Sequence, residues 1–291
     1  MYNKRQRRVK KSISEIVTLS IFTVIIFLWC ISFLYMGFWA IINSLKTPFE
    51  FYESSYAMPT NPQWHNYIDA FTKITLKNTP IYEMAWNTIW MAFLGSFVNV
   101  AASTMVAYAV SKFVFPGRNI VYGIAIFVQV VPIIGAGSAG YKLLVNLNFI
   151  NNPALMWISW GNGFDFAFLV LYGYFLSVSN FYSEAAEIDG AGEFTIMMKV
   201  VLPQAMPAVL SLTLMQLIGM WNNYNISLIY MKGYPSLALG LFEFQEQSGF
   251  TGTGDPVYLA AVLMSMLPIL AVYIAFQDTI MNNMSVGGLK G

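Results

Sequence analysis

The sequence is poor in charge, in cysteine and in histidine. Only 10% of its 291 residues are charged and 57% are hydrophobic, whereas a soluble domain carries roughly 25% charged residues. The bilayer is therefore the expected solvent. The single cysteine, Cys30, excludes an internal disulfide. A formal net charge of +1 argues against a nucleic-acid partner.

The same scarcity argues against a catalytic, ion-coupling or nucleotide-binding site in this chain. An intramembrane enzyme needs a nucleophile with a base, or a metal site, and the apolar runs contain no histidine and no pair of carboxylates. An ion-driven carrier needs such groups inside its spans, and Asp165 lies at a boundary. The pattern closest to a phosphate-binding loop has Tyr141 after Gly140, where the motif requires lysine. We therefore predict a chain that is not an enzyme and binds no cofactor or metal of its own.

Long uncharged runs predict an all-α, polytopic membrane protein with six transmembrane helices. The runs are residues 16–45, 84–111, 119–141, 166–183, 200–231 and 256–277. Each can supply the roughly 17–25 residues that a spanning helix needs, although the fourth is barely long enough. The first run is too long for the roughly 7–15 apolar residues of a signal peptide. We expect a first helix at 16–45, a loop at 46–83 and a five-helix core at 84–281.

Lysine and arginine residues set the orientation. They crowd the N-terminal segment 1–15, which should therefore stay in the cytoplasm. Alternating sides from there puts ten of the 15 lysines and arginines inside and five outside. The tail 282–291 is then cytoplasmic and the loop 46–83 extracytoplasmic, in a protein of the cell membrane. That loop is rich in proline and aromatic residues, so it is either an interfacial loop packed on the bundle or a docking surface for an external protein.

A polar island, residues 183–203, interrupts the apolar pattern on the predicted cytoplasmic side. It carries four acidic residues and one basic residue: Glu184, Glu187, Asp189, Glu193 and Lys199. An interfacial helix attracted to anionic lipid should be basic. The island therefore favours a protein partner over a lipid surface.

The order of residues in the island predicts a helical elbow. Ser183 is suited to cap a short helix, which the following alanines favour. An Asp-Gly pair ending at Gly190 is a turn signal that stops this helix. Residues 193–201 can form a second short helix, and Pro203 then opens the fifth membrane helix, a position that proline tolerates. The elbow would present small side chains and acids to a partner.

The spacing within the island resembles the signature of the permease subunits of ABC importers. The signature is Glu-Ala-Ala, three residues, Gly, nine residues, an aliphatic residue, one residue, and Leu-Pro. It is met by Glu184, Ala185, Ala186, Gly190, Val200, Leu202 and Pro203. The family most often has isoleucine at the aliphatic position. Resemblance to the sugar-importing, maltose-type branch rests on Asp189-Gly190-Ala191, on Trp221-Asn222-Asn223-Tyr224 and on the ending Gly287–Gly291.

This resemblance implies a type I ABC importer permease fold and a set of partners. The elbow would be the coupling helix that docks on a separate ATPase, with contacts from Glu184, Ala185, Ala186, Glu187, Asp189, Gly190, Ala191 and Pro203. ATP and magnesium would be bound by two ATP-binding subunits. A second, homologous permease would complete a heterodimeric pore in the lipid membrane. An extracytoplasmic solute-binding protein would deliver the carbohydrate, an oligosaccharide.

Polar residues inside the fifth run are candidates for the substrate path. They are Gln216, Trp221, Asn222, Asn223 and Tyr224. Amide groups suit the hydroxyls of a sugar and aromatic rings suit its C–H face. Two alternatives stay open: these amides satisfy one another between helices, or the companion permease holds most of the contacts. A permease of the same fold that imports a peptide or an amino acid is the alternative function.

Overall fold

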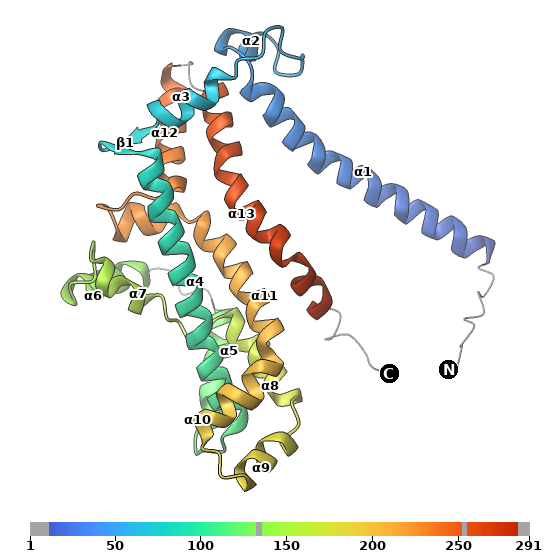
Figure 1. Cartoon of the computed structure of the whole chain (residues 1–291), viewed down its shortest axis with the longest axis vertical. Helices are drawn as coiled ribbons and strands as arrows, with labels where there is room; N and C mark the ends of the chain where they lie inside the picture. Colours follow the sequence, from blue (N-terminus) through green and yellow to red (C-terminus); the bar gives the residue numbers. More distant parts are fainter. Residues whose placement is uncertain (1–11, 132–135, 252–254, 285–291) are drawn as a thin grey trace.

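The computed structural model describes residues 12–131, 136–251 and 255–284, which are mostly helical. Long helices run side by side, with short helices at both ends of the bundle (Figure 1). The helices are α1 (Ile13–Ser44), α2 (Pro48–Glu53), α3 (His65–Lys73), α4 (Ile81–Lys112), α5 (Arg118–Val130), α6 (Ala136–Asn146), α7 (Pro153–Ser159), α8 (Phe166–Ser177), α9 (Phe181–Ile188), α10 (Glu193–Ile196), η1 (Met197–Val201), α11 (Leu202–Trp221), η2 (Ile226–Tyr230), α12 (Leu237–Thr251) and α13 (Asp255–Met284). A two-residue hairpin pairs β1 (Thr75–Leu76) antiparallel with β2 (Thr79–Pro80).

Four described helices are long and apolar enough to cross a membrane. They are α1, α4, the continuous stretch Glu193–Trp221 and residues Asp255–Asp278 of α13. The pair α8 and α9 is a fifth candidate, with its two axes bent by 71°. α5 is apolar but has only 13 residues. The all-α, multi-span fold is thus confirmed, whereas the count of six spans stays a prediction.

The predicted span 119–141 does not form one continuous helix. α5 ends at Val130, and the next residue, Val131, adopts an extended conformation with φ −89° and ψ 112°. The sequence gives the reason, because Val131 precedes Pro132, and a residue before proline disfavours the α-helical conformation. The end of the predicted span falls in α6, which is a separate helix.

The predicted span 200–231 is also too long as a single helix. α11 ends at Trp221, ten residues before the predicted end. The Asn222 side-chain amide donates to the Ile218 carbonyl at 2.9 Å, and the Asn223 side-chain oxygen accepts from the Asn225 amide at 3.0 Å. Such side-chain bonds to the backbone compete with the helical ladder. The chain turns here and continues in the π-helix η2.

The main apolar core lies where α4, α8 and α11 meet. Its buried side chains include Val100 of α4, Phe168 and Leu171 of α8 and Ala205 of α11. Phe168 and Leu171 are fully buried. A second cluster at the opposite end joins α3, the hairpin, α12 and α13 to the start of α4. α4 therefore connects the two ends of the bundle.

The predicted loop 46–83 folds into a compact cap at the far end from α9 and α10 (Figure 1). The Lys46 ammonium is buried and donates to the Asn43 side-chain oxygen at 2.9 Å and the Ser54 carbonyl at 2.8 Å. Burial lowers the pKa of Lys46, against the opposing effect of the Glu50 carboxylate. This network fixes the end of α1 to the cap.

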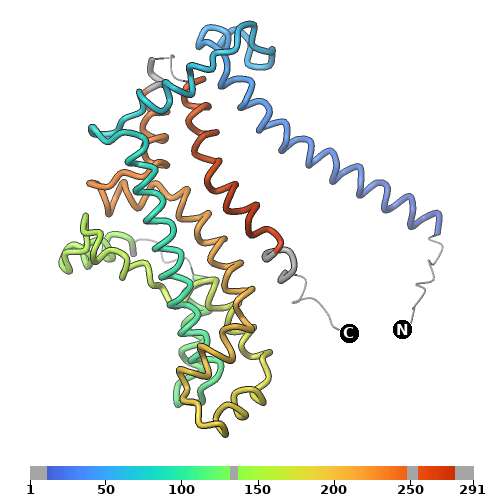
Figure 2. The backbone as a smooth tube through the Cα atoms, in the orientation of Figure 1, coloured from blue at the N-terminus to red at the C-terminus, as the bar shows by residue number. Residues whose placement is uncertain are grey.

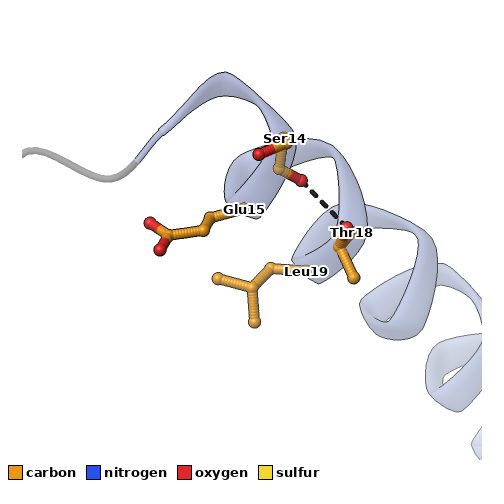
Figure 3. Close-up of a pocket in the computed structure, with 4 residues that line it drawn as sticks. All are labelled: Ser14, Glu15, Thr18 and Leu19. Carbon is orange, nitrogen blue, oxygen red and sulfur yellow. Dashed lines mark hydrogen bonds between the residues drawn. The ribbon is translucent and has the colours of Figure 1, made fainter.

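α1 leaves the bundle as it runs away from the cap (Figure 2). No residue in its most apolar stretch is buried within the chain. At its start the Ser12 amide donates to the Glu15 carboxylate at 3.0 Å, and Figure 3 shows the Thr18 hydroxyl donating to the Ser14 carbonyl at 2.9 Å. Side chains on all faces of α1 must therefore be covered by lipid or by another protein.

Candidate functional site: the elbow and a cavity between helices

The elbow forms as two short helices at the end of the bundle opposite the cap (Figure 1). α9 ends in a left-handed glycine, Gly190, with φ 81°. The Gly190 amide donates to the Glu187 carbonyl and the Ala191 amide to the Ala186 carbonyl, each at 2.9 Å. These two bonds form a Schellman motif, which satisfies the last carbonyls of a helix. The Asp-Gly turn predicted from the sequence is confirmed.

The start of the elbow differs from the prediction. α9 begins at Phe181, two residues before Ser183, so Ser183 is not its cap. The Phe181 amide donates instead to the Ser179 hydroxyl at 3.2 Å, and the Glu184 amide to the Asn180 carbonyl at 2.9 Å. The upstream serine and asparagine thus supply an earlier start. The Ser183 hydroxyl is buried without a hydrogen-bond partner in the described part of the chain.

The eight residues predicted to contact the ATPase divide between two faces of the elbow. Ala186 and Ala191 pack against the main core. The others are exposed to solvent: Glu184, Ala185, Glu187, Asp189, Gly190 and Pro203. Ile188 and Phe194 are 87% and 71% exposed, and the signature does not include them. Their place beside the acids gives the exposed face an apolar part as well as an acidic one.

After the second turn the elbow continues into the membrane without a break. α10 and the π-helix η1 lead directly into α11, with Pro203 in its first turn. The second short helix predicted over 193–201 is confirmed, and so is the position of Pro203. A continuous helix therefore connects the elbow to α11 and can transmit its movement.

A cavity of about 340 Å³ lies between α4, α8 and α11. Its polar lining comes from Asn99, Asn162, Asp165 and Gln216, and Leu212 and Met215 add an apolar wall. The volume lies at the lower end of the roughly 300–1,000 Å³ of small-molecule pockets. Of the five residues predicted for the substrate path, Gln216 lines this cavity.

Two of the polar groups are held in place by the fold. Asn99 is only 5% exposed; its amide donates to the Trp160 carbonyl at 3.2 Å, and its side-chain oxygen has no partner among the described residues. The Asp165 carboxylate accepts from the Ser103 hydroxyl at 2.7 Å and from the Phe168 amide at 3.1 Å. A buried acceptor without a partner costs about 1–3 kcal/mol.

The cavity lies near the middle of the bundle. Asn99 is 13 residues from the end of α4, Asp165 is 12 from the end of α8, and Gln216 is 14 from the start of α11. At about 1.5 Å per residue, all three lie about 18–21 Å from the elbow ends of their helices. Asp165 directly precedes α8, at the start of the predicted fourth span, as the sequence indicated. Because α8 begins beside the middle of α4, this end of the predicted span does not lie at an end of the bundle.

The other four residues of the predicted path lie beyond the cavity, where α11 ends. Trp221 is buried, whereas Asn222 and Asn223 are exposed. The Tyr224 ring stacks on Phe242 with 4.8 Å between ring centroids. The five residues predicted for the path therefore lie in two places, Gln216 in the cavity and Trp221–Tyr224 beyond it. Asn162 and Asp165 also line the cavity, which the sequence could not indicate because their place beside α4 depends on how α8 packs.

Nothing in the described residues groups three or more histidine, cysteine, aspartate or glutamate side chains as metal ligands. The described chain offers an exposed helical elbow and a polar cavity between membrane helices.

Comparison with known proteins gives consistent results. The diacetylchitobiose uptake system permease protein of Streptomyces coelicolor is 24% identical over 269 residues, covering 91% of this chain and 87% of that protein. The trehalose/maltose transport system permease protein of Thermococcus litoralis is 26% identical over 231 residues, covering 78% and 81%. A solved bacterial ABC transporter involved in the import of alginate has the same fold, with a TM-score of 0.75 at 22% identity, covering 93% of this chain and 99% of that one.

The family match includes both the elbow and the cavity. The family described as binding-protein-dependent transport system inner membrane component matches residues 99–285. The match begins at Asn99 in the cavity and contains α8, the elbow, α11 and the described part of α13. The chain is a multi-pass membrane protein, and it belongs to the family of binding-protein-dependent transport system inner membrane components.

Proposed function

We propose that this chain is the permease subunit of an ATP-driven carbohydrate importer. It forms half of a translocation pore and hydrolyses no ATP itself. The observation that carries the proposal is the elbow: an exposed acidic and apolar surface, continuous with α11, at one end of a bundle that belongs to this family. Such a surface suits docking on a separate ATPase pair that binds ATP and magnesium.

The proposed cargo is an oligosaccharide. Two relatives are named for the uptake of diacetylchitobiose and of trehalose or maltose, and these names favour a sugar over a peptide or an amino acid. The cavity supports the same choice, because amide and carboxylate oxygens beside an apolar wall suit a ring with hydroxyls and a C–H face. We assign Gln216 and Trp221–Tyr224 to the path on this basis.

A second, homologous permease is the proposed partner within the membrane. The surface of α1 is exposed along its apolar stretch, and the α4 and α11 faces expose Phe97 and Met215. A companion subunit and membrane lipid would together cover these side chains. An extracytoplasmic solute-binding protein would dock at the cap that carries α2 and α3.

The proposed orientation puts both termini and the elbow in the cytoplasm. The charge distribution of the sequence supports it, since ten of 15 lysines and arginines then lie inside. The cap lies outside in this arrangement. Most of the N-terminal segment 1–15 and of the tail 282–291 lies outside the described residues.

Purification of the assembled complex tests this function. The chain, expressed with its companion permease, ATPase and binding protein, should copurify with the ATPase. In proteoliposomes the loaded binding protein should stimulate ATP hydrolysis when it carries the transported saccharide. Stimulation by peptides or amino acids and by no saccharide would support the alternative cargo, and a chain that binds no ATPase would refute the function.

The cavity gives a second prediction. Gln216→Met keeps the length of the side chain and removes its polar groups, so it should lower saccharide uptake by roughly fivefold to tenfold, as expected for the loss of about 1 kcal/mol per hydrogen bond. ATP hydrolysis stimulated by the binding protein should persist. Met215→Leu, in the same wall, is the control and should transport normally. Equal uptake by the two variants would remove Gln216 from the path.

A further inference from the structure

Lys112, the last residue of α4, connects that helix to the beginning of the elbow. Its ammonium donates to the Val178 carbonyl at 2.7 Å and to the Asn180 side-chain oxygen at 2.9 Å. Val178 follows the end of α8, and Asn180 precedes the first residue of α9. The Lys112 side chain therefore bonds to the segment between α8 and α9, where the two helix axes bend by 71°.

The ends of two helices explain why a cation lies here. Lys112 is in the last turn of α4, and the Val178 carbonyl lies just past the end of α8. Helix C-termini carry partial negative charge and favour cations. The ammonium thus bonds to oxygens of the α8–α9 break, while the nearby Glu184, Glu187 and Glu193 line the same polar cavity of about 260 Å³ without forming a salt bridge to it in the described chain.

Apolar contacts also join α9 to the bundle, since Ala186 packs against the main core. The elbow reaches α11 covalently through α10 and η1. α8 reaches α11 through a hydrogen bond from the Tyr174 hydroxyl to the Gln204 carbonyl. α4 has no covalent path to the elbow shorter than the 68 residues that separate Lys112 from Asn180. The Lys112 hydrogen bonds provide a direct non-covalent contact between the end of α4 and the beginning of the elbow.

α4 carries side chains of the membrane cavity that would have to move when the elbow moves. Asn99 lines the membrane cavity, and Ser103 orients the Asp165 carboxylate at 2.7 Å. An α-helix transmits an axial displacement along its length, so a pull at Lys112 would reach Asn99 about 20 Å away.

We propose that Lys112 is a positioning residue of energy coupling: its ammonium makes α4 move together with the elbow, so that ATPase movements reach the cavity through α4 as well as through α11. This inference rests on the proposed function as a permease driven by a separate ATPase. It assigns Lys112 no contact with the saccharide or with the ATPase.

The test measures saccharide uptake per ATP hydrolysed in proteoliposomes of the whole complex. Lys112→Met keeps the apolar stem and removes both bonds; the complex should assemble and hydrolyse ATP, with uptake per ATP lowered by about tenfold, as expected for the loss of hydrogen bonds from a charged group. Lys112→Arg keeps the charge and should restore most of the ratio. Arg118→Met is the matched control, because the Arg118 guanidinium donates to the Ser111 carbonyl at 3.0 Å, within the end of α4, and among the described residues makes no bond to the α8–α9 break.

A second variant removes the Asn180 side-chain oxygen, one of the two acceptors of the Lys112 ammonium. Asn180→Leu should lower the ratio less than Lys112→Met, and the double variant should be no worse than Lys112→Met alone, since both act through one contact. An unchanged ratio in Lys112→Met would overturn the inference. Loss of uptake that only follows loss of assembled complex would also overturn it, because the role would then be structural. A wild-type chain that binds no ATPase would instead refute the proposed function.

Discussion

A Gly190→Val variant should assemble into the complex and lose most of its ATP-driven saccharide uptake. Gly190 has φ 81°, and a side chain there costs about 1–2 kcal/mol or more, with branched residues the least tolerated. The strain would open the turn and break the bonds that close α9, from Gly190 to Glu187 and from Ala191 to Ala186. The exposed acids would then no longer present one surface. Uptake by vesicles with ATP inside should fall by about tenfold.

Gly192→Val is the matched control for this experiment. Gly192 has φ −76°, which any residue adopts, and an added Cβ at either glycine meets no atom within 4 Å. The two variants therefore differ in backbone strain and not in steric contact. If Gly190→Val transports as well as Gly192→Val, the shape of the turn is irrelevant to coupling.

Phe168→Ala should strongly destabilise the folded chain. Phe168 is fully buried between α4 and α8, and its ring lies 5.6 Å from that of Phe164 and 5.9 Å from that of Tyr172, measured between centroids. Truncation of such a side chain costs about 3–5 kcal/mol through lost contacts and the cavity left behind. Thermal unfolding in detergent should show a markedly lower midpoint, and the yield from membranes should fall.

Phe166→Ala provides the comparison on the same helix. Phe166 is 58% exposed, so its truncation leaves no internal cavity. Its unfolding midpoint should lie close to that of the wild type. Similar losses from both variants would mean that α8 is not packed against α4 as described.

The sequence was sufficient where a local rule decides the structure. The turn at Gly190 follows from an Asp-Gly pair, and the start of α11 follows from the tolerance of proline in a first turn. The long helices α1 and α4 follow from hydrophobic length alone. Each of these features needs only residues that are neighbours in the chain.

The sequence was insufficient where distant residues decide. One local feature was also missed, because hydropathy predicts ten more residues of helix after Trp221, where two asparagine side chains bond to the nearby backbone. The cavity joins Asn99 to Asp165 and Gln216, and no spacing along the chain encodes that meeting. In the sequence Lys112 is one more cytoplasmic charge, and only the fold brings it to the α8–α9 break. The path residues and the coupling contacts themselves stay predictions.

The π-helical turn η1 gives the fixed spacing of the signature a geometric meaning. The Leu202 amide bonds five residues back to Met197, so this turn holds one residue more than an α-helical turn. Deleting one residue between Met197 and Val201 would convert this turn to an ordinary α-helical turn and leave the helix on its two sides with nearly the same relative rotation, because the π-turn already absorbs the extra residue. The acids of α9 would then keep nearly the same direction and depth. A one-residue deletion within α11 has no such extra residue to remove, so it should rotate the elbow by about 100° relative to the rest of that helix.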